Sequence, residues 1–230
     1  MGVGEASGMF PIDSQRNDYD ERMLSAFDSL AKPYGFPWRL KDLLPKVRVA
    51  GQPAGRLTEA GARLLNPSGA LQSGVPVAPP EGDAGTGMIA TDSVAMRTGN
   101  VSAGTSIFAM VVLERPLNRM YPEIDMVTTP AGRPVAMAHC NNCTSDWDAW
   151  VKVLKETASL FGADPSTPEL YDRLYEKSLE GADDCAGILT YNYLSGEPVT
   201  GLAEGRPMVV RRPDAQFTLS NFLRANLYSA

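Results

Sequence analysis

The sequence predicts an α/β fold, and three observations after residue 98 predict it. A hairpin pattern covers 100–113, where "NVSA" and "IFAMVVL" flank a "GTS" turn. Two strongly amphipathic helices follow in 144–181. Two short β-rich segments and a last helix then fill 188–228. The order of hairpin, strand, helices, strand and helix is that of an α/β unit.

The first ninety or so residues do not form a complete unit of this pattern. A helix is expected over 18–31, because Tyr19, Met23 and Leu30 recur at helical spacing. A short helix at 58–65 has Thr58 as its expected N-cap. "GVPVAPP" at 74–80 is typical of a short strand that ends in proline, with no obvious sheet partner.

A helix that begins at Asp83 is expected within 82–91, although its glycines lower helix propensity. The second arm of the hairpin, 107–113, is apolar on both faces, which indicates a buried strand. A third strand is expected at 133–139, "RPVAMAH".

Two helices after residue 143 are the clearest of the chain. In 144–161, Trp147, Trp150, Val151 and further apolar residues form one face, and Gly162 supplies a stop. The next helix is expected to have Thr167 as N-cap and Pro168 at its first position, with apolar residues facing inward. These are Leu170, Leu174 and Leu179. Short strands at 188–193 and 208–211 precede a helix at 216–228.

Composition excludes several classes of function. The 230 residues, 43% hydrophobic and 21% charged, suffice for one large domain or two small ones. A net charge of −6 without a basic run makes nucleic acid an unlikely partner. No apolar run reaches the roughly 18 residues of a membrane helix, and no signal-peptide pattern opens the chain. Three cysteines give no disulfide framework and favour a reducing cytoplasm.

The turn Gly104-Thr105-Ser106 offers backbone N–H groups and hydroxyls without bulky side chains, which is what a phosphate requires. A plain hairpin turn is the alternative, and these residues alone favour it. Asp83 lies among small residues at a helix start, where its ionised form is favoured and could accept a proton from an alcohol. The alternative is a helix-capping aspartate, which these residues alone also favour.

"HCNNC", residues 139–143, contains a C-x-x-C motif that raises a metal or redox interpretation. It supplies only half of a zinc site, and His139 is the sole histidine. Cys140, Cys143 and Cys185 are therefore expected to be buried structural thiols, and no metal-binding residue is predicted.

Several segments together resemble the FGGY family of carbohydrate kinases, which includes xylulokinases, ribulokinases and glycerol kinase. The most specific element is the "GD" of "GDAGTGM" (82–88) followed by the "GTS" of "SAGTSIFAMV" (102–111). The other matching segments are "EASGMFPIDSQRNDYDERML" (5–24), "LPKVRVAGQPAGRLT" (44–58) and "GRPMVVRRPDAQFTLSNFLRANLYSA" (205–230).

The resemblance implies α/β, actin-like ATPase (ribonuclease H-like) domains, with an active site in the cleft between them. Residues 1–97 would be the C-terminal part of the first, sugar-binding domain, and 98–230 the N-terminal part of the second, nucleotide-binding domain. Asp83 matches the catalytic base, which also binds the sugar hydroxyl. Gly104, Thr105 and Ser106 match the turn that contacts the phosphates of ATP, with Mg²⁺ bridging those phosphates.

The implied function is ATP-dependent phosphorylation of a sugar hydroxyl, with a pentulose or other ketose as substrate. The family's first phosphate loop and its adenine-side glycine-rich motif have no counterpart here, so the chain resembles a central piece of such a kinase. The alternative is a degenerate kinase fragment that only binds. The expected partners are a small-molecule sugar and ATP, with a homodimer as an option, in the cytoplasm.

Overall fold

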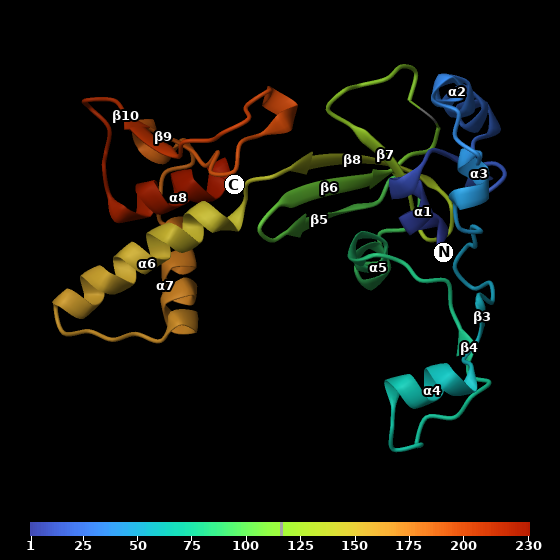
Figure 1. Cartoon of the computed structure of the whole chain (residues 1–230). Coiled ribbons are helices and arrows are strands. Elements are labelled where there is room, and N and C mark those ends of the chain that lie inside the picture. Colours follow the sequence, from blue (N-terminus) through green and yellow to red (C-terminus); the bar gives the residue numbers. More distant parts are fainter. Residues whose placement is uncertain (116) are drawn as a thin grey trace. The chain divides into compact units, whose positions relative to one another are not determined.

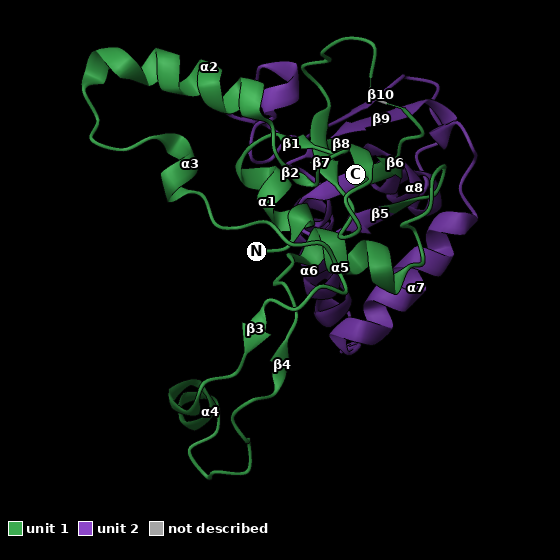
Figure 2. Ribbon diagram, turned by 90° about the vertical axis from the view of Figure 1, so that its right-hand side faces the viewer, with its two compact units in different colours: residues 1–100, 109–138 green, residues 101–108, 139–230 purple. Residues whose placement is uncertain are grey.

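The computed structural model describes residues 1–115 and 117–230 (Figure 1). The chain forms two compact units, which are coloured in Figure 2. Unit 1 consists of Met1–Asn100 and Ala109–Ala138, and unit 2 consists of Val101–Phe108 and His139–Ala230. No helix in the described ranges is both long enough and apolar enough to cross a bilayer.

A four-stranded sheet has the strand order β5-β6-β8-β7. Its strands are β5 (Gly99–Ala103), β6 (Ile107–Val112), β7 (Asp125–Thr128) and β8 (Pro134–Cys140). The expected hairpin is confirmed, because β5 and β6 are neighbours joined by three residues, and so short a connection joins only antiparallel strands. The strand expected at 133–139 is confirmed as β8. β7 pairs antiparallel with it, with Val127 opposite Val135.

Unit 1 begins with a helix that the sequence did not predict, α1 (Val3–Met9). β1 (Ile12–Asp13) and β2 (Asp18–Tyr19) then form a small antiparallel ribbon. α2 (Glu21–Ala31) starts three residues later than expected. The physical reason is Asp20, whose carboxylate accepts hydrogen bonds from the N–H groups of Arg22 (2.8 Å) and Met23 (3.2 Å) and so caps the helix.

The buried core of this part of unit 1 is small. Ala6, Tyr19 and Leu24 form its centre. The apolar residues packed around them are Met1, Phe10, Ile12, Leu40, Leu44 and Val47. Leu30 was expected on the inner face of α2 but is 75% exposed, so the buried stripe of this helix is narrower than its sequence period indicates. A 3₁₀ turn, η1 (Lys32–Tyr34), and the short α3 (Leu40–Leu43) follow.

β3 (Gly55–Arg56) and β4 (Pro76–Val77) pair antiparallel and carry α4 (Glu59–Leu65) between them (Figure 1). The short strand and the short helix were both expected, and the N-cap of α4 is confirmed. The Oγ1 of Thr58 accepts a hydrogen bond of 3.0 Å from the N–H of Gly61. α5 (Asp83–Ala90) begins at the residue that the sequence indicates.

Unit 2 is built on three helices, α6 (Thr144–Leu160), α7 (Thr167–Leu179) and α8 (Leu219–Ser229). β9 (Ile188–Tyr191) and β10 (Met208–Arg211) form a separate antiparallel ribbon, so both expected strands are confirmed. Short 3₁₀ turns, η2 (Cys185–Gly187) and η3 (Pro198–Thr200), lie between these elements. Its core contains Trp147, Val151, Leu170, Leu174, Cys185, Ile188, Phe222, Leu223 and Ala225.

Two local predictions for α7 are wrong. Ser166 is the N-cap, because its Oγ accepts from the N–H of Glu169 (3.4 Å), which moves Thr167 and Pro168 one position into the helix. Leu179 is 76% exposed rather than inward-facing, since the helix ends there. α6 ends at Leu160, and the expected stop, Gly162, follows its C-cap Phe161 with a φ of 80°, a left-handed conformation that glycine adopts at little cost.

Candidate functional site

Asp83 is an exposed carboxylate at the first position of α5. The capping position belongs to Gly82, so the alternative that Asp83 is the N-cap of this helix is wrong by one residue. Its Oδ1 accepts a hydrogen bond of 2.8 Å from the N–H of Ala84. None of the ion pairs found in the described part of unit 1 involves it, so the carboxylate is accessible and has no counter-ion there.

The segment that leads into Asp83 is fixed by Glu81, a residue that the sequence analysis missed. The Glu81 carboxylate accepts hydrogen bonds from the N–H groups of Gly4 (3.2 Å) and Glu5 (2.8 Å) in the first turn of α1. Burial raises the pKa of Glu81. Gly2 makes room for this contact, because a Cβ there would lie 2.2 Å from Glu81 Oε1. The chain next to Asp83 is thus attached to α1.

A cavity of about 280 Å³ in unit 1 lies beside the start of α5. Gly82, Ala84 and Gly85 line it from α5, and Glu5 lines it from α1. Methionines make up much of its apolar wall, namely Met9, Met88, Met110 and Met137. The small residues of "GDAGTGM" therefore leave open space next to the candidate base, as their sizes indicated.

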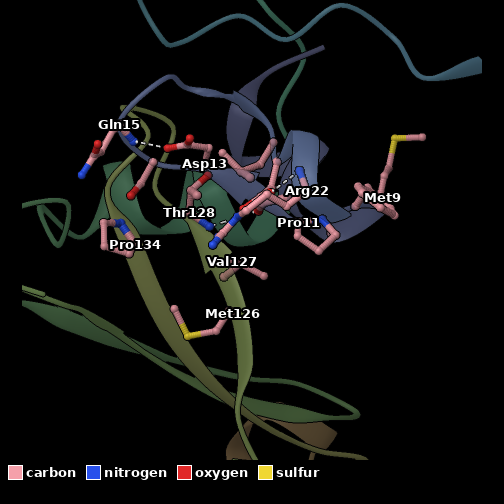
Figure 3. Close-up of a pocket in the computed structure, with 15 residues that line it drawn as sticks. Met9, Pro11, Asp13, Gln15, Arg22, Met126, Val127, Thr128 and Pro134 are labelled. Carbon is pink, nitrogen blue, oxygen red and sulfur yellow. Dashed lines mark hydrogen bonds and ion pairs between the residues drawn. The ribbon is translucent and has the colours of Figure 1, made fainter. Parts of the chain in front are cut away.

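A second, larger pocket of about 630 Å³ lies in unit 1 between the end of α1, β1, the start of α2 and β7 (Figure 3). Its charged side chains form local hydrogen bonds. Asp13 Oδ1 accepts from the N–H of Gln15 (2.9 Å), and Arg22 Nη2 donates to Asp20 Oδ2 (3.0 Å). Arg22 lowers the pKa of Asp20 through that bond. The pocket has no uncompensated cation, so we assign it no role in phosphate binding.

The turn Gly104-Thr105-Ser106 is held in unit 2 by its carbonyl groups. The N–H of Cys143 donates to Thr105 O (3.1 Å), and the N–H of Thr144 donates to Gly104 O (3.1 Å). These bonds cap the start of α6, whose N-cap, Cys143, has no side-chain cap of its own. Within the described residues of unit 2, the N–H groups and hydroxyls of Thr105 and Ser106 donate no hydrogen bond. Four donors therefore remain available on this turn.

Asp83 belongs to unit 1, and the turn of residues 104–106 belongs to unit 2. A groove shared by Asp83 and the turn therefore stays a prediction.

The "HCNNC" motif joins the end of β8 to α6. All three cysteines are free; Cys143 and Cys185 are buried as expected, whereas Cys140 is exposed. The expectation for Cys140 is wrong, because this residue ends β8 at an exposed position. In the described ranges, no group of three or more His, Cys, Asp or Glu residues is arranged to hold a metal ion. Asn142 and Glu197, which the sequence analysis also missed, are buried together here.

Cys140 should react slowly with alkylating reagents near pH 8. Although Cys140 is exposed as a residue, partial desolvation of its thiol, and then the negative charge of Glu197, raise the pKa of this thiol, so less thiolate is present than in an ordinary cysteine. Glu197→Gln removes the charge, and the pKa should therefore fall while remaining above its usual value. The pH dependence of iodoacetamide labelling measures this, with Cys140→Ser identifying the signal. An unchanged or higher midpoint in Glu197→Gln would contradict the assignment.

Comparison with known proteins identifies the family. The model of the C-terminal domain of the FGGY family of carbohydrate kinases matches residues 99–230, which is more than half of the chain. Curated protein sequences gave no match.

Solved structures share the fold at low identity. A xylulose kinase from Rhodospirillum rubrum has a TM-score of 0.68 at 16% identity, over 99% of this chain and 42% of that one. A gluconate kinase from Lactobacillus acidophilus has a TM-score of 0.61 at 16% identity, over 95% and 41%. Glycerol kinase from Plasmodium falciparum, determined with ADP, has a TM-score of 0.59 at 12% identity, over 95% and 38%. The chain thus spans about two-fifths of the length of these kinases. The mixed α/β architecture is that of the actin-like kinase fold, and the chain belongs to the FGGY family of carbohydrate kinases.

Proposed function

We propose that this chain forms part of an enzyme that transfers the terminal phosphoryl group of ATP to a sugar hydroxyl, with a pentulose or another ketose as acceptor. Family membership supports the class of reaction. The observation that carries the proposal is the turn at residues 104–106. Its carbonyl groups at 104 and 105 accept from the N–H groups at the start of α6, while two N–H groups and two hydroxyls donate no bond within the described part of unit 2. Such a set of donors suits the oxygens of a phosphate chain.

Asp83 has the properties that a general base for this reaction needs. It is exposed and has no ion-pair partner within the described part of unit 1, and its chain neighbours Gly82 and Ala84, though not Asp83 itself, line a cavity. In the proposed reaction its carboxylate takes the proton of the sugar hydroxyl while that oxygen bonds to the γ-phosphorus. The bond from phosphorus to the bridging oxygen breaks, and ADP leaves with the electron pair. A common groove for Asp83 and the turn is part of this proposal.

Magnesium fits this chain as an ion carried by the nucleotide. Mg²⁺ in kinases is held by substrate phosphates and one or two carboxylates rather than by a cage of protein ligands. The described residues contain no group of three or more His, Cys, Asp or Glu that could form such a cage. The ion would neutralise phosphate charge, while the donors of the turn would orient the phosphates.

The division into domains at residues 97 and 98, the cytoplasmic location and a homodimer remain predictions.

Binding of Mg-ATP tests the proposal directly. Isothermal titration of the chain should give saturable binding, and Thr105→Val should weaken it about tenfold or more, because a hydroxyl that donates to a charged phosphate is lost while the shape of the side chain is kept. Thr157→Val is the matched control, since the Thr157 hydroxyl bonds the carbonyl of Val153 on the surface of α6. Equal weakening by both variants, or none by Thr105→Val, would count against the phosphate role.

A second candidate is a binding module that does not turn over substrate. The turn of residues 104–106 fits it as well, because its donors can bind a nucleotide whether or not a base acts on a sugar. Titration with Mg-ATP and a coupled assay of ADP release together separate the two candidates. Binding without sugar-dependent ADP release supports the module, and release that requires a pentulose or polyol supports the kinase.

A further inference from the structure

The asparagine pair of "HCNNC" has a structural role that neither a metal site nor a redox site explains. Asn142 is 5% exposed, and each polar atom of its side chain is engaged. Its Nδ2 donates to Gly196 O (2.6 Å) and Glu197 Oε2 (3.3 Å), and its Oδ1 accepts from the N–H of Ser195 (2.8 Å). The carbonyl of Asn142 accepts from Asn192 Nδ2 (3.3 Å). Asn142 is thus fixed from two sides by the loop after β9.

Glu197, which lies in the same loop after β9, completes this junction. It is 3% exposed, and its Oε2 also accepts a hydrogen bond of 2.9 Å from the N–H of Asn141. No ion pair found in the described residues of unit 2 involves Glu197, so only neutral donors hold this carboxylate. Its backbone is fixed as well, because its N–H and carbonyl both bond to Leu202. Burying a charge without a counter-ion is costly, so the buried carboxylate of Glu197 depends on the hydrogen bonds from Asn141 and Asn142.

The junction leads directly to the turn. Cys143 follows Asn142 in the chain, and its N–H donates to Thr105 O. The next N–H, that of Thr144, donates to Gly104 O. Because Asn142 is held in place, the next two backbone N–H groups, those of Cys143 and Thr144, are held against the carbonyl groups of the turn. The carbonyls are thus held, while the N–H groups and hydroxyls of residues 105 and 106 donate no hydrogen bond within the described residues of unit 2.

We propose that Asn142 and Glu197 are positioning residues that hold the turn of residues 104–106 in the orientation needed to receive nucleotide phosphates. The hydrogen bonds of unit 2 support the link between the junction and the turn. The effect of this link on nucleotide binding rests on the proposed function. The junction acts through hydrogen bonds rather than through charge. Glu197→Gln keeps an oxygen that can accept from both Asn141 and Asn142, so it should preserve the turn.

Amide hydrogen exchange combined with Mg-ATP titration tests the proposal. In Asn142→Ala, the N–H groups of Gly104, Cys143 and Thr144 should exchange at least about tenfold faster, because the bonds that fix their surroundings are lost. Affinity for Mg-ATP should fall by a similar factor. Glu197→Ala, which removes the acceptor of the Asn141 and Asn142 bonds, should change both measurements in the same direction, and Glu197→Gln, which keeps an acceptor oxygen, should restore both toward the parent. Asn226→Ala is the matched control, since Asn226 is also 5% exposed in unit 2 but bonds only Phe222 O within α8.

The outcomes separate this inference from the proposed function. Faster exchange at the turn in Asn142→Ala but not in Asn226→Ala supports the link. Equal acceleration in both variants shows a general loss of stability and overturns it. If the parent binds Mg-ATP and Asn142→Ala binds equally well, the positioning role is overturned while the proposed function stands. If exchange changes as expected but the parent binds no Mg-ATP, the link stands and the proposed function fails.

Discussion

Asp83→Asn is expected to lower sugar-dependent ADP formation by roughly 100- to 10,000-fold, the usual contribution of a general base. The amide has nearly the size of the carboxylate and can still accept from the N–H of Ala84, so α5 should keep its start. It cannot take a proton from a hydroxyl at neutral pH. A coupled assay over a panel of pentuloses and polyols compares the two proteins.

Glu59→Gln is the matched control for this measurement. Glu59 is also an exposed carboxylate at the first position of a helix, α4, where it pairs with Arg63 across one turn. Loss of an exposed pair of this kind costs little. ADP formation by Glu59→Gln should therefore equal that of the parent. Equal turnover by the parent and Asp83→Asn would refute the assignment of the base.

Trp147→Ala is expected to lower the free energy of unfolding by about 3–5 kcal/mol, the typical cost of truncating a buried large aromatic residue. Trp147 is 3% exposed in the core of unit 2 and stacks on Tyr175 of α7, with ring centroids 5.2 Å apart and planes 3° apart. The substitution would leave a cavity between α6 and α7. Urea unfolding followed by far-ultraviolet circular dichroism measures the loss.

Trp147→Phe tests the same packing without emptying the site. The Nε1 of Trp147 is buried and has no hydrogen-bond partner among the described residues, so removing it leaves no partner unsatisfied. Phenylalanine keeps a ring against Tyr175, and the loss should be less than half that of Trp147→Ala. A loss as large for phenylalanine as for alanine would show that a ring stacked on Tyr175 does not carry the stabilisation.

Elements with a strong periodic pattern could be predicted from the sequence. β6 has a continuous apolar sequence, and α6 has Trp147 and Val151 four residues apart, so the hydrophobic pattern predicts both elements. The expectation that β6 is buried on both faces is wrong, because Met110 and Val112 are buried while Val111 between them is 49% exposed. α5 could be placed at Asp83, although its glycines lower helix propensity, because a carboxylate is favoured in the first turn of a helix. In each case the local sequence and the packed structure favour the same element.

Elements that depend on distant partners could not be predicted. α1 has the weakly helical sequence "VGEASGM", and its first turn is capped by Glu81, 76 residues further along the chain from Glu5. β7 is a four-residue strand that β8 stabilises by pairing. The same limit applies to the Asn142–Glu197 junction, whose members are 55 residues apart. No local pattern encodes such contacts.

The candidate site shows the same division. The resemblance to FGGY kinases indicated Asp83 and the turn by type, and the structure adds that the carboxylate is exposed and that the turn is held through its carbonyls. The supporting residues Glu81 and Asn142 became visible only from their hydrogen bonds. The sequence therefore predicted the groups proposed to meet the substrate but not those that hold them.

The most direct test of the whole account replaces Mg²⁺ with paramagnetic Mn²⁺ on bound ATP and follows the amide signals of the isotope-labelled chain. The ion lies at the phosphates, so it broadens the signals of nearby amides. The account predicts broadening of Thr105 and Ser106 and also of Ala84, the neighbour of Asp83. Broadening confined to residues 105 and 106 at saturating nucleotide, with Ala84 unaffected, would contradict it.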